Sequence, residues 1–539
     1  MIEIQNPVLP GFHPDPSILR VGDDYYIANS TFEWQPGVVI HHSLDLVNWR
    51  LIGHALTGNS SPNLAAVDNS SGIWAPSLSY ADGKFWLIYT EVRTRVGPFK
   101  DLKNFLVSSE SILGPWSAPV FLNSSGFDPS LFHDEISAGG DGRKWLINMR
   151  WDFRQNHPSF DGIIAQEYDP VSRALVGPIT TLLQKDRLIE GPNLYKVNGA
   201  YFLMLAEGGT GWNHGISMAR SKSLTGPYEV DPVSLLMTSR GDDGAGDPAI
   251  ALQKSGHGEL VQTARGEWYV VHLASRPLGS GANRRCILGR ETCLQKVEWT
   301  ADGWLRLVGG GTEPKINVAP PIGAPILAWP EKPVRDDFDA GELSSYWSSL
   351  RTPVDSTWIS LSDRPGWIRL IGRESIHSFH EQSLVAQRVQ SFHITAETCL
   401  EFEPRTSNHL AGLICWYDTR THYFLRVTRD DGKKVVGIIL TDDGKYDELA
   451  ESDLQINDWK RIFLRAVIGK ENLDFFASPD GVNWNKIGPT LDSSKLSDDY
   501  GQGLHFTGAM IGLCAQDIDC SGCHADFDYF VLKNNATHN

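Results

Sequence analysis

The chain has 539 residues, which is too many for a single hydrophobic core, so we expect at least two domains. Its formal net charge of -17 argues against nucleic acids and anionic membranes as partners, because basic patches supply that affinity. No apolar run approaches the ~20 residues that a membrane-spanning helix needs. The composition therefore favours a globular protein with an uncharged partner, and neither nucleic acid nor membrane among its partners.

The first residues, MIEIQNPVLPGFHPDPS, contain neither the basic segment nor the apolar segment of a signal peptide. We therefore expect a cytoplasmic protein, with secretion after removal of a leader as the alternative. Seven cysteines in a chain of this length do not make a disulfide framework. Cys520 and Cys523 form a single C-x-x-C pair, which is weak evidence for zinc, and their disulfide state stays open.

One short pattern recurs five times in the first 310 residues, each time followed by a polar turn and an aromatic-rich, strand-like segment. The five copies are DPSIL from Asp15, WAPSL from Trp74, DPSLF from Asp128, EGPNLY from Glu190 and HGELV from His257. The steps between their lead residues are 59, 54, 62 and 67 residues. This period and the strand–turn–strand units are typical of propeller blades. The sequence therefore predicts an all-β fold whose first domain, residues 1–315, is a five-bladed β-propeller.

Three copies begin with a carboxylate, namely Asp15, Asp128 and Glu190. The start of each inner strand of a propeller faces the central axis, so these acids are expected to converge there. Three carboxyl groups that converge at the mouth of a funnel are typical of an active site and not of a solvated surface. The pattern therefore predicts an active site at the axis.

The stretch from Gly309 to Pro333 is rich in glycine and proline, and within it we place a linker at residues 316–333. Residues 334–539 contain alternating apolar segments such as AGLICWYD and RIFLRAVIG, which predict a C-terminal β-sandwich. No acid pair with a repeat-like context occurs in this second domain. The chemistry is therefore expected in the first domain.

The motifs resemble those of the two-domain β-xylosidases of glycoside hydrolase family 43. The resemblance spans nearly the whole chain and rests on NPVLPGFHPDPSI, GIWAPSL, FDPSLF, NMRWD, EGPNLY, GHGELV, LGRET, HFTGAMIGLCAQD and ADFDYF. It implies a five-bladed propeller followed by a jelly-roll or concanavalin-like sandwich that closes the active-site pocket. It also implies an exo-acting, inverting hydrolase that releases D-xylose from the non-reducing ends of β-1,4-xylo-oligosaccharides, with α-L-arabinofuranosidase side activity.

By this resemblance, Asp15 is the general base, Glu190 the general acid, and Asp128 the acid that tunes the pKa and orients the site. The same likeness and the chemistry of sugar binding give six substrate-binding candidates: Phe32, Trp74, Trp151, His257, Arg290 and Phe506. No cofactor is required, and a calcium ion bound mostly through water near His257 is left as an alternative. The resemblance also implies a homo-oligomer, either a dimer or a tetramer.

Two other functions remain open at this point. An α-L-arabinofuranosidase as the main activity is compatible with every motif, because the two sugars present similar hydroxyl groups. A non-catalytic carbohydrate-binding propeller would predict loss of at least one of the three acids, yet all three are present.

Overall fold

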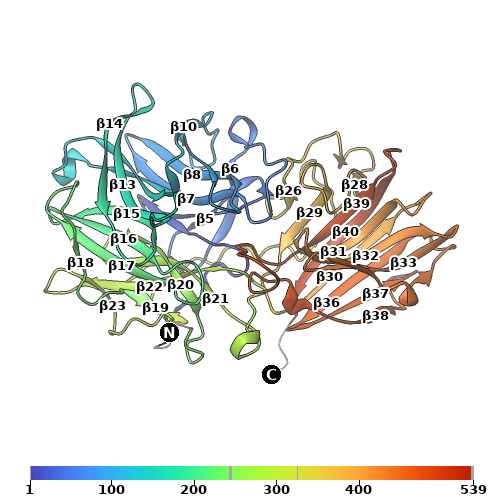
Figure 1. Cartoon of the computed structure of the whole chain (residues 1–539). Helices are drawn as coiled ribbons and strands as arrows, with labels where there is room; N and C mark the ends of the chain where they lie inside the picture. The colour runs from blue at the N-terminus through green and yellow to red at the C-terminus, as the bar shows by residue number, and fades with distance from the viewer. Residues whose placement is uncertain (1, 242–245, 325, 536–539) are drawn as a thin grey trace.

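The computed structural model describes residues 2–241, 246–324 and 326–535, and over these residues the predicted all-β architecture is confirmed. Two domains lie side by side: the propeller comes first along the chain and the sandwich follows it (Figure 1). The only helical segments in the described ranges are single turns of 3-10 helix, so none is long and apolar enough to cross a bilayer. These turns are η1 (Gly58–Ser60), η2 (Ile136–Ala138), η3 (Gly281–Asn283), η4 (Ala450–Ser452) and η5 (Ser493–Lys495).

Five antiparallel sheets form the propeller, each with four strands in sequence order from the inner to the outer edge, and the fourth sheet has a fifth, short strand beside its third. The first blade is β2 (Ser17–Val21), β3 (Asp24–Asn29), β5 (Gly37–Ser43) and β6 (Arg50–Leu56). The second blade is β7 (Gly72–Ala81), β8 (Lys84–Thr94), β9 (Asp101–Ser109) and β10 (Val120–Asn123). The third blade is β11 (Gly126–His133), β12 (Lys144–Trp151), β13 (Phe160–Asp169) and β14 (Ala174–Leu183). The fourth blade is β15 (Ile189–Val197), β16 (Ala200–Glu207), β17 (Gly215–Ser221) and β18 (Glu229–Val230), and β19 (Met237–Thr238) also pairs with β17. The fifth blade is β20 (Gln253–Gln262), β21 (Trp268–Ser275), β22 (Glu291–Trp299) and β23 (Leu305–Leu307).

Local sequence explains the tight hairpins of these blades. Asp82 and Gly83 both have positive φ angles, of 55° and 73°, and they join β7 to β8 as a two-residue loop. Asn198 and Gly199 do the same between β15 and β16, with φ angles of 50° and 79°. Two successive left-handed residues match the twist of the flanking strands, and Asn, Asp and Gly adopt that conformation most readily.

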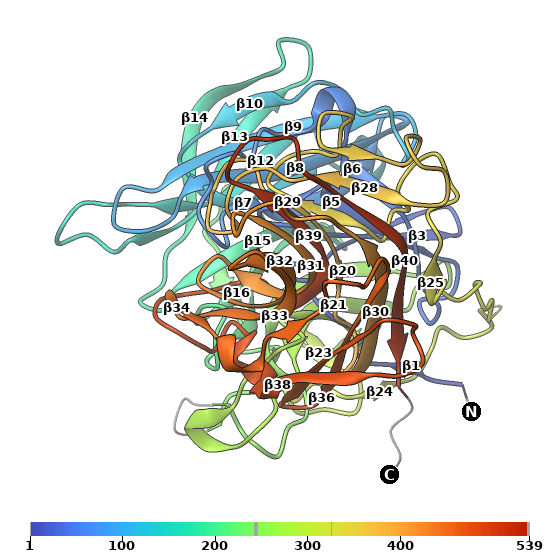
Figure 2. The same cartoon turned by 90° about the vertical axis from the view of Figure 1, so that its right-hand side faces the viewer.

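The sandwich consists of two antiparallel sheets around one large apolar core. One sheet runs β27 (Ile359–Ser360), β28 (Ile368–Ile371), β40 (His524–Asn534), β30 (His393–Glu401), β36 (Ile462–Gly469), β37 (Asn472–Ser478), β38 (Asn485–Asp492), with β25 (Arg335–Asp336) on β40. The other runs β34 (Lys445–Glu448), β33 (Lys433–Asp442), β32 (Thr421–Asp430), β31 (His409–Asp418), β39 (Met510–Asp517), β29 (Ser383–Arg388), β26 (Ser348–Leu350), with β35 (Leu454–Gln455) on β33. Figure 2 looks along the molecule with the sandwich in front of the propeller.

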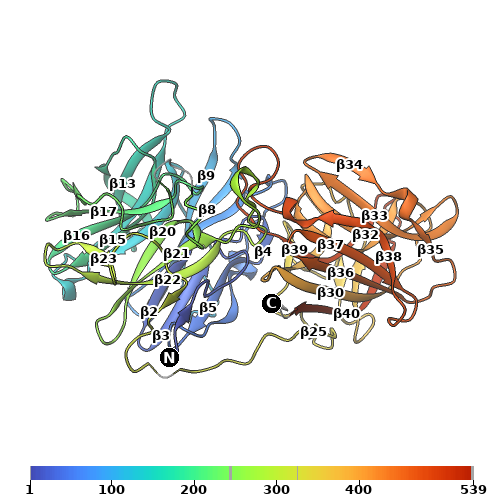
Figure 3. The same cartoon turned by 90° about the horizontal axis from the view of Figure 1, so that it is seen from below.

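Two pairs of short strands from distant parts of the chain close the propeller and join it to the sandwich. β1 (Ile4–Gln5) pairs with β24 (Asn317–Val318), so the two ends of the propeller meet. β4 (Trp34–Gln35), which the sequence analysis placed in the propeller, pairs with β26 and forms the edge of a sandwich sheet, at the junction seen in Figure 3. Trp34 is fully buried in an apolar cluster that both domains share. The domains therefore have a common core and not only a contact surface.

Candidate active site

The five repeats place one residue each in the same unusual backbone conformation at the inner strands. Asp128 and His257, for example, have φ angles of 53° and 50°. Asp15, Ala75 and Gly191 occupy the same position in the other blades, with φ angles of 48°, 39° and 56°. A left-handed residue in a strand locally turns the chain, and the strand pairing shifts at this point in blades two to five. The repeat therefore produces a ring of turned side chains around one axis.

Two repeats are offset by one residue from the register that the sequence analysis used. The structurally equivalent positions are Ala75 and Gly191, whereas Trp74 and Glu190 precede them. A Cβ atom at Gly191 would lie 2.9 Å from the ring of His257, so no other side chain fits there. The carboxylate of the fourth blade is consequently supplied by the preceding residue.

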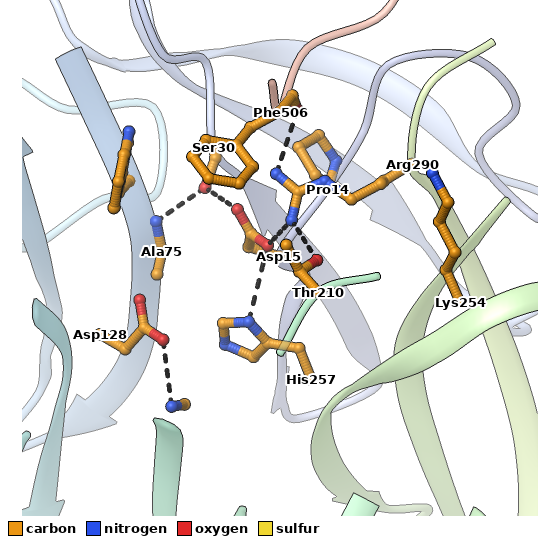
Figure 4. Close-up of polar contacts among 12 residues, drawn as sticks. Pro14, Asp15, Ser30, Ala75, Asp128, Thr210, Lys254, His257, Arg290 and Phe506 are labelled. Atoms are coloured by element: carbon orange, nitrogen blue, oxygen red, sulfur yellow. Dashed lines mark hydrogen bonds and ion pairs between the residues drawn. The ribbon is translucent and has the colours of Figure 1, made fainter. Parts of the chain in front are cut away.

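Asp15 is buried and held by three side chains. Its Oδ1 accepts a hydrogen bond from Arg290 Nη1 at 2.9 Å, and its Oδ2 accepts one from Ser30 Oγ at 2.8 Å. His257 Nδ1 lies 3.5 Å from Oδ1 (Figure 4). Ser30 Oγ in turn accepts the backbone N–H of Ala75 at 2.7 Å, which ties blade one to blade two.

These contacts keep the carboxyl of Asp15 ionised. Burial acts to raise its pKa, but the charge of Arg290 and the hydrogen bond from His257 outweigh burial and hold the pKa well below its usual range. An ionised, hydrogen-bonded carboxylate is the form that a general base needs.

The pKa values of Asp128 and Glu190 are shifted upward, in the opposite direction to that of Asp15. The pKa of Glu190 is raised by burial first, and then by the negative charges of Asp128 and Asp15. The pKa of Asp128 is also raised, by burial and by Asp15, although its Oδ2 accepts the N–H of Gly191 at 3.0 Å. One carboxyl kept ionised beside another kept protonated is the pairing that acid–base catalysis of glycoside cleavage uses.

His257 faces all three carboxyl groups, and their charges overcome burial and raise its pKa to about 9. A protonated imidazole has no lone pair to offer a metal ion. Among the described residues, the groups of metal-ligating side chains do not include His257. A protonated His257 thus does not fit direct metal coordination, and the alternative of a calcium ion bound mostly through water near this ring stays a prediction.

All nine candidate side chains from the sequence analysis line one cavity of about 510 Å³. Phe32, Trp74 and Phe506 form an aromatic cluster, with ring centroids 5.4 to 6.1 Å apart. Trp151 packs against Phe160, with ring centroids 5.4 Å apart, and Phe127 lies between it and Trp74, with centroids 6.5 and 5.7 Å from the two indoles. Such apolar faces suit the C–H faces of an uncharged sugar.

The sandwich supplies one side of this cavity. Phe506 belongs to a segment before β39 that also contributes Asp498, Asp499, Leu504 and His505 to the lining. A cavity with one closed side and one open side accepts the end of a chain more readily than its middle.

Several lining residues were missed by sequence reasoning. Lys254 Nζ binds Asp499 at 2.6 Å and Asp498 at 3.2 Å, which ties β20 to the sandwich segment. Thr210 Oγ1 accepts a second hydrogen bond from Arg290 Nη1 at 2.9 Å. Lys254 lies three residues before His257, so its position in the repeat was a usable signal. The two acids and Thr210 lie outside the repeats, and their sequence surroundings carry no such signal.

Comparison with known proteins agrees with this geometry. Residues 4–305 match the model of the glycosyl hydrolases family 43, and residues 335–533 match that of the β-xylosidase C-terminal concanavalin A-like domain. The chain belongs to glycosyl hydrolase family 43. This confirms the resemblance that the motifs indicated, and with it a glycoside hydrolase built from a propeller and a concanavalin-like sandwich.

Full-length relatives of this family 43 enzyme are available for comparison. The crystal structure of a xylan β-1,4-xylosidase from Bacillus halodurans C-125 superposes with a TM-score of 0.95 at 50% identity, covering 98% of this chain and 100% of that one. A xylan 1,3-β-xylosidase from a Vibrio species is 45% identical over 541 residues, 98% of each chain. A xylosidase/arabinosidase from Humicola insolens is 43% identical over 544 residues, 99% of this chain and 98% of that one.

Proposed function

We propose that this enzyme is an exo-acting β-xylosidase that releases D-xylose from the non-reducing ends of β-1,4-xylo-oligosaccharides with inversion. The observation that carries the proposal is that Asp15, bonded to Arg290 and Ser30, and Glu190, whose pKa is raised, line one cavity that Phe506 closes on one side. The choice of xylose as the sugar rests on the names of the relatives that match over nearly the whole chain.

Each acid has a separate task in this reaction. Asp15 takes a proton from water as that water attacks the anomeric carbon, and Glu190 gives its proton to the leaving oxygen. Asp128 acts through its charge, which helps to keep Glu190 protonated until the bond breaks. Arg290 and His257 balance the negative charge around Asp15.

The test is proton NMR during hydrolysis of xylobiose. Inversion at a β-linkage predicts that α-xylose appears before mutarotation, whereas β-xylose as the first product would contradict the assignment. A β-1,3-linked xylobiose measured in parallel decides the linkage, since one relative carries that specificity in its name. Asp15→Asn serves as the inactive control for traces of other glycosidases.

α-L-Arabinofuranosidase activity is the second candidate, favoured by the Humicola relative that is named for both sugars. Rates on nitrophenyl β-xyloside and nitrophenyl α-L-arabinofuranoside, measured side by side, separate main from side activity. A ratio that favours the arabinoside would reverse the order proposed here.

Three further expectations are part of the proposal. The enzyme is a homo-oligomer, either a dimer or a tetramer, which light scattering measures. It works in the cytoplasm, where its seven free thiols would stay reduced. It needs no cofactor, so prolonged treatment with a chelator should leave its rate unchanged; a calcium-dependent loss would instead support the ion near His257.

A further inference from the structure

A segment of the sandwich runs directly against the backbone that carries Arg290. The N–H of Ala509 donates to the carbonyl of Ile287 at 3.0 Å. A Cβ atom at Gly289 would lie 2.7 Å from the carbonyl oxygen of Thr507, and one at Gly508 would lie 3.0 Å from that of Leu288. The two backbones therefore touch, and their relative position is fixed without intervening side chains.

Arg290 uses this contact to orient its guanidinium group. Nη1 donates to Asp15 and Thr210, while Nη2 donates to the backbone carbonyl of Phe506 at 3.0 Å (Figure 4). One of the three acceptors of this buried arginine thus comes from the sandwich. A planar guanidinium held at both Nη atoms cannot turn about its end without losing a bond.

The backbone N–H of Phe506 is held by Ser70, a residue between blades one and two. Ser70 Oγ accepts the N–H of Phe506 at 3.0 Å, and the N–H of Ser70 donates to Glu33 Oε2 at 3.1 Å. The carbonyl of Ser70 also accepts the indole N–H of Trp74 at 3.0 Å. Ser70 is 1% exposed, so water does not compete for these bonds.

We propose that Ser70 is a positioning residue for catalysis: by holding the N–H of Phe506, it fixes the carbonyl that orients Arg290 against the general base. Ser70 thus bonds the N–H of Phe506, the carbonyl of the same residue bonds Arg290, and Arg290 bonds Asp15. The sandwich acts in this chain as part of the support of the base and not only as a wall of the cavity.

The contact between the Phe506 carbonyl and Arg290 affects the charge state of Asp15, because Arg290 is hydrogen-bonded to both. The charged groups facing its carboxylate are Arg290, His257, Asp128 and Glu190. Of these, Arg290 has a hydrogen bond to the sandwich, so loosening Phe506 weakens the attraction that keeps Asp15 ionised.

The experiment compares Ser70→Ala with Ser71→Ala in the full-length enzyme. The two serines are adjacent and equally buried, but Ser71 Oγ has no hydrogen-bond partner among the described residues. We measure kcat/KM for nitrophenyl β-xyloside against pH, over the range in which tryptophan emission shows all variants folded. The acid side of that profile reports the ionisation of the carboxyl groups at the axis, and because the pKa of Asp15 lies below its usual range, the profile is followed down to the lowest pH at which all variants stay folded.

Ser70→Ala is expected to move the acid limb upward by roughly half to one pH unit, which lowers kcat/KM up to about tenfold at the former limb. Ser71→Ala should leave the acid limb at the same pH as in the enzyme without substitutions. Phe506→Ala, which removes the ring but keeps the carbonyl, raises KM and leaves the limb in place.

Coincident limbs for Ser70→Ala and Ser71→Ala would overturn the proposal, even if both variants were less stable. The inference rests on the proposed function, and the two fail differently. An unchanged enzyme inactive on xylosides and arabinosides contradicts the function, whereas an active enzyme indifferent to Ser70→Ala contradicts only the positioning role.

Discussion

Replacing Lys254 with methionine tests how strongly the two domains are coupled at the cavity. Lys254 is 3% exposed, and its ammonium group bridges Asp498 and Asp499 of the sandwich segment. Methionine keeps most of the volume and removes the charge. The two acids then lose their buried countercharge.

Breaking a buried ion pair from one side costs about 3–5 kcal/mol, because an uncompensated charge remains. We expect the lower end of this range for Lys254→Met, because burial already raises the pKa of Asp498 and that carboxyl can become neutral by taking up a proton. For a domain of 150–250 residues, about 3 kcal/mol corresponds to a fall in Tm of roughly 6–12 °C. The segment that carries Phe506 is anchored at this point, so KM is also expected to rise.

Differential scanning calorimetry measures the effect, with the exposed Lys222 replaced by methionine as the matched control. Surface substitutions of that kind are expected to stay within about 0.5 kcal/mol. Adding Asp498→Asn to Lys254→Met should recover part of the loss, with a coupling on the order of 1–3 kcal/mol. If Lys254→Met is no more destabilised than the Lys222 control, the ion pair does not join the domains as described.

Three further predictions follow from the site and the shared core. Asp15→Asn and Glu190→Gln each lower kcat about a thousandfold or more with unchanged circular dichroism; more than a few per cent of residual rate would remove that residue from its role. Asp128→Asn removes a negative charge that raises the pKa of Glu190, so the alkaline limb of the pH profile should move to lower pH by roughly one unit; an unmoved limb would leave Asp128 with a structural role. A fragment of residues 1–320 lacks the partner of β4 and the other half of the buried cluster around Trp34, so it should be inactive and insoluble, and a soluble, active fragment would refute the shared core.

The sequence predicts the propeller well because the blades repeat a local pattern. Every blade has an aromatic-rich second strand, and in the second and fourth blades an Asp–Gly or Asn–Gly turn joins it to the inner strand, so the pattern is visible within a few neighbouring residues. The same repeat brought Asp15, Asp128 and Glu190 together at the axis. Its register could not be read to the single residue, since the offset at Glu190 arises from the contact between Gly191 and the ring of His257.

The contacts between domains could not be predicted in the same way. Ser70 binds Phe506, which lies 436 positions away in the chain, and Lys254 binds Asp499, which lies 245 positions away. The repeat marks the position of Lys254, but nothing near Ser70 or Asp499 in the sequence marks theirs. Phe506 was found through the family motif and not through its chemistry. Its backbone carbonyl, which binds Arg290, is common to every residue type and therefore invisible in a sequence.

β4 has a consequence for how the protein is made. Trp34 and Gln35 emerge early from the ribosome, but Ser349 and Leu350, with which they pair, are synthesised roughly 15–60 s later at ordinary elongation rates. Until then the indole of Trp34 and the backbone of Trp34 and Gln35 lack their partners from the sandwich. The catalytic cavity cannot be complete before Phe506 is synthesised, because that residue forms part of its wall.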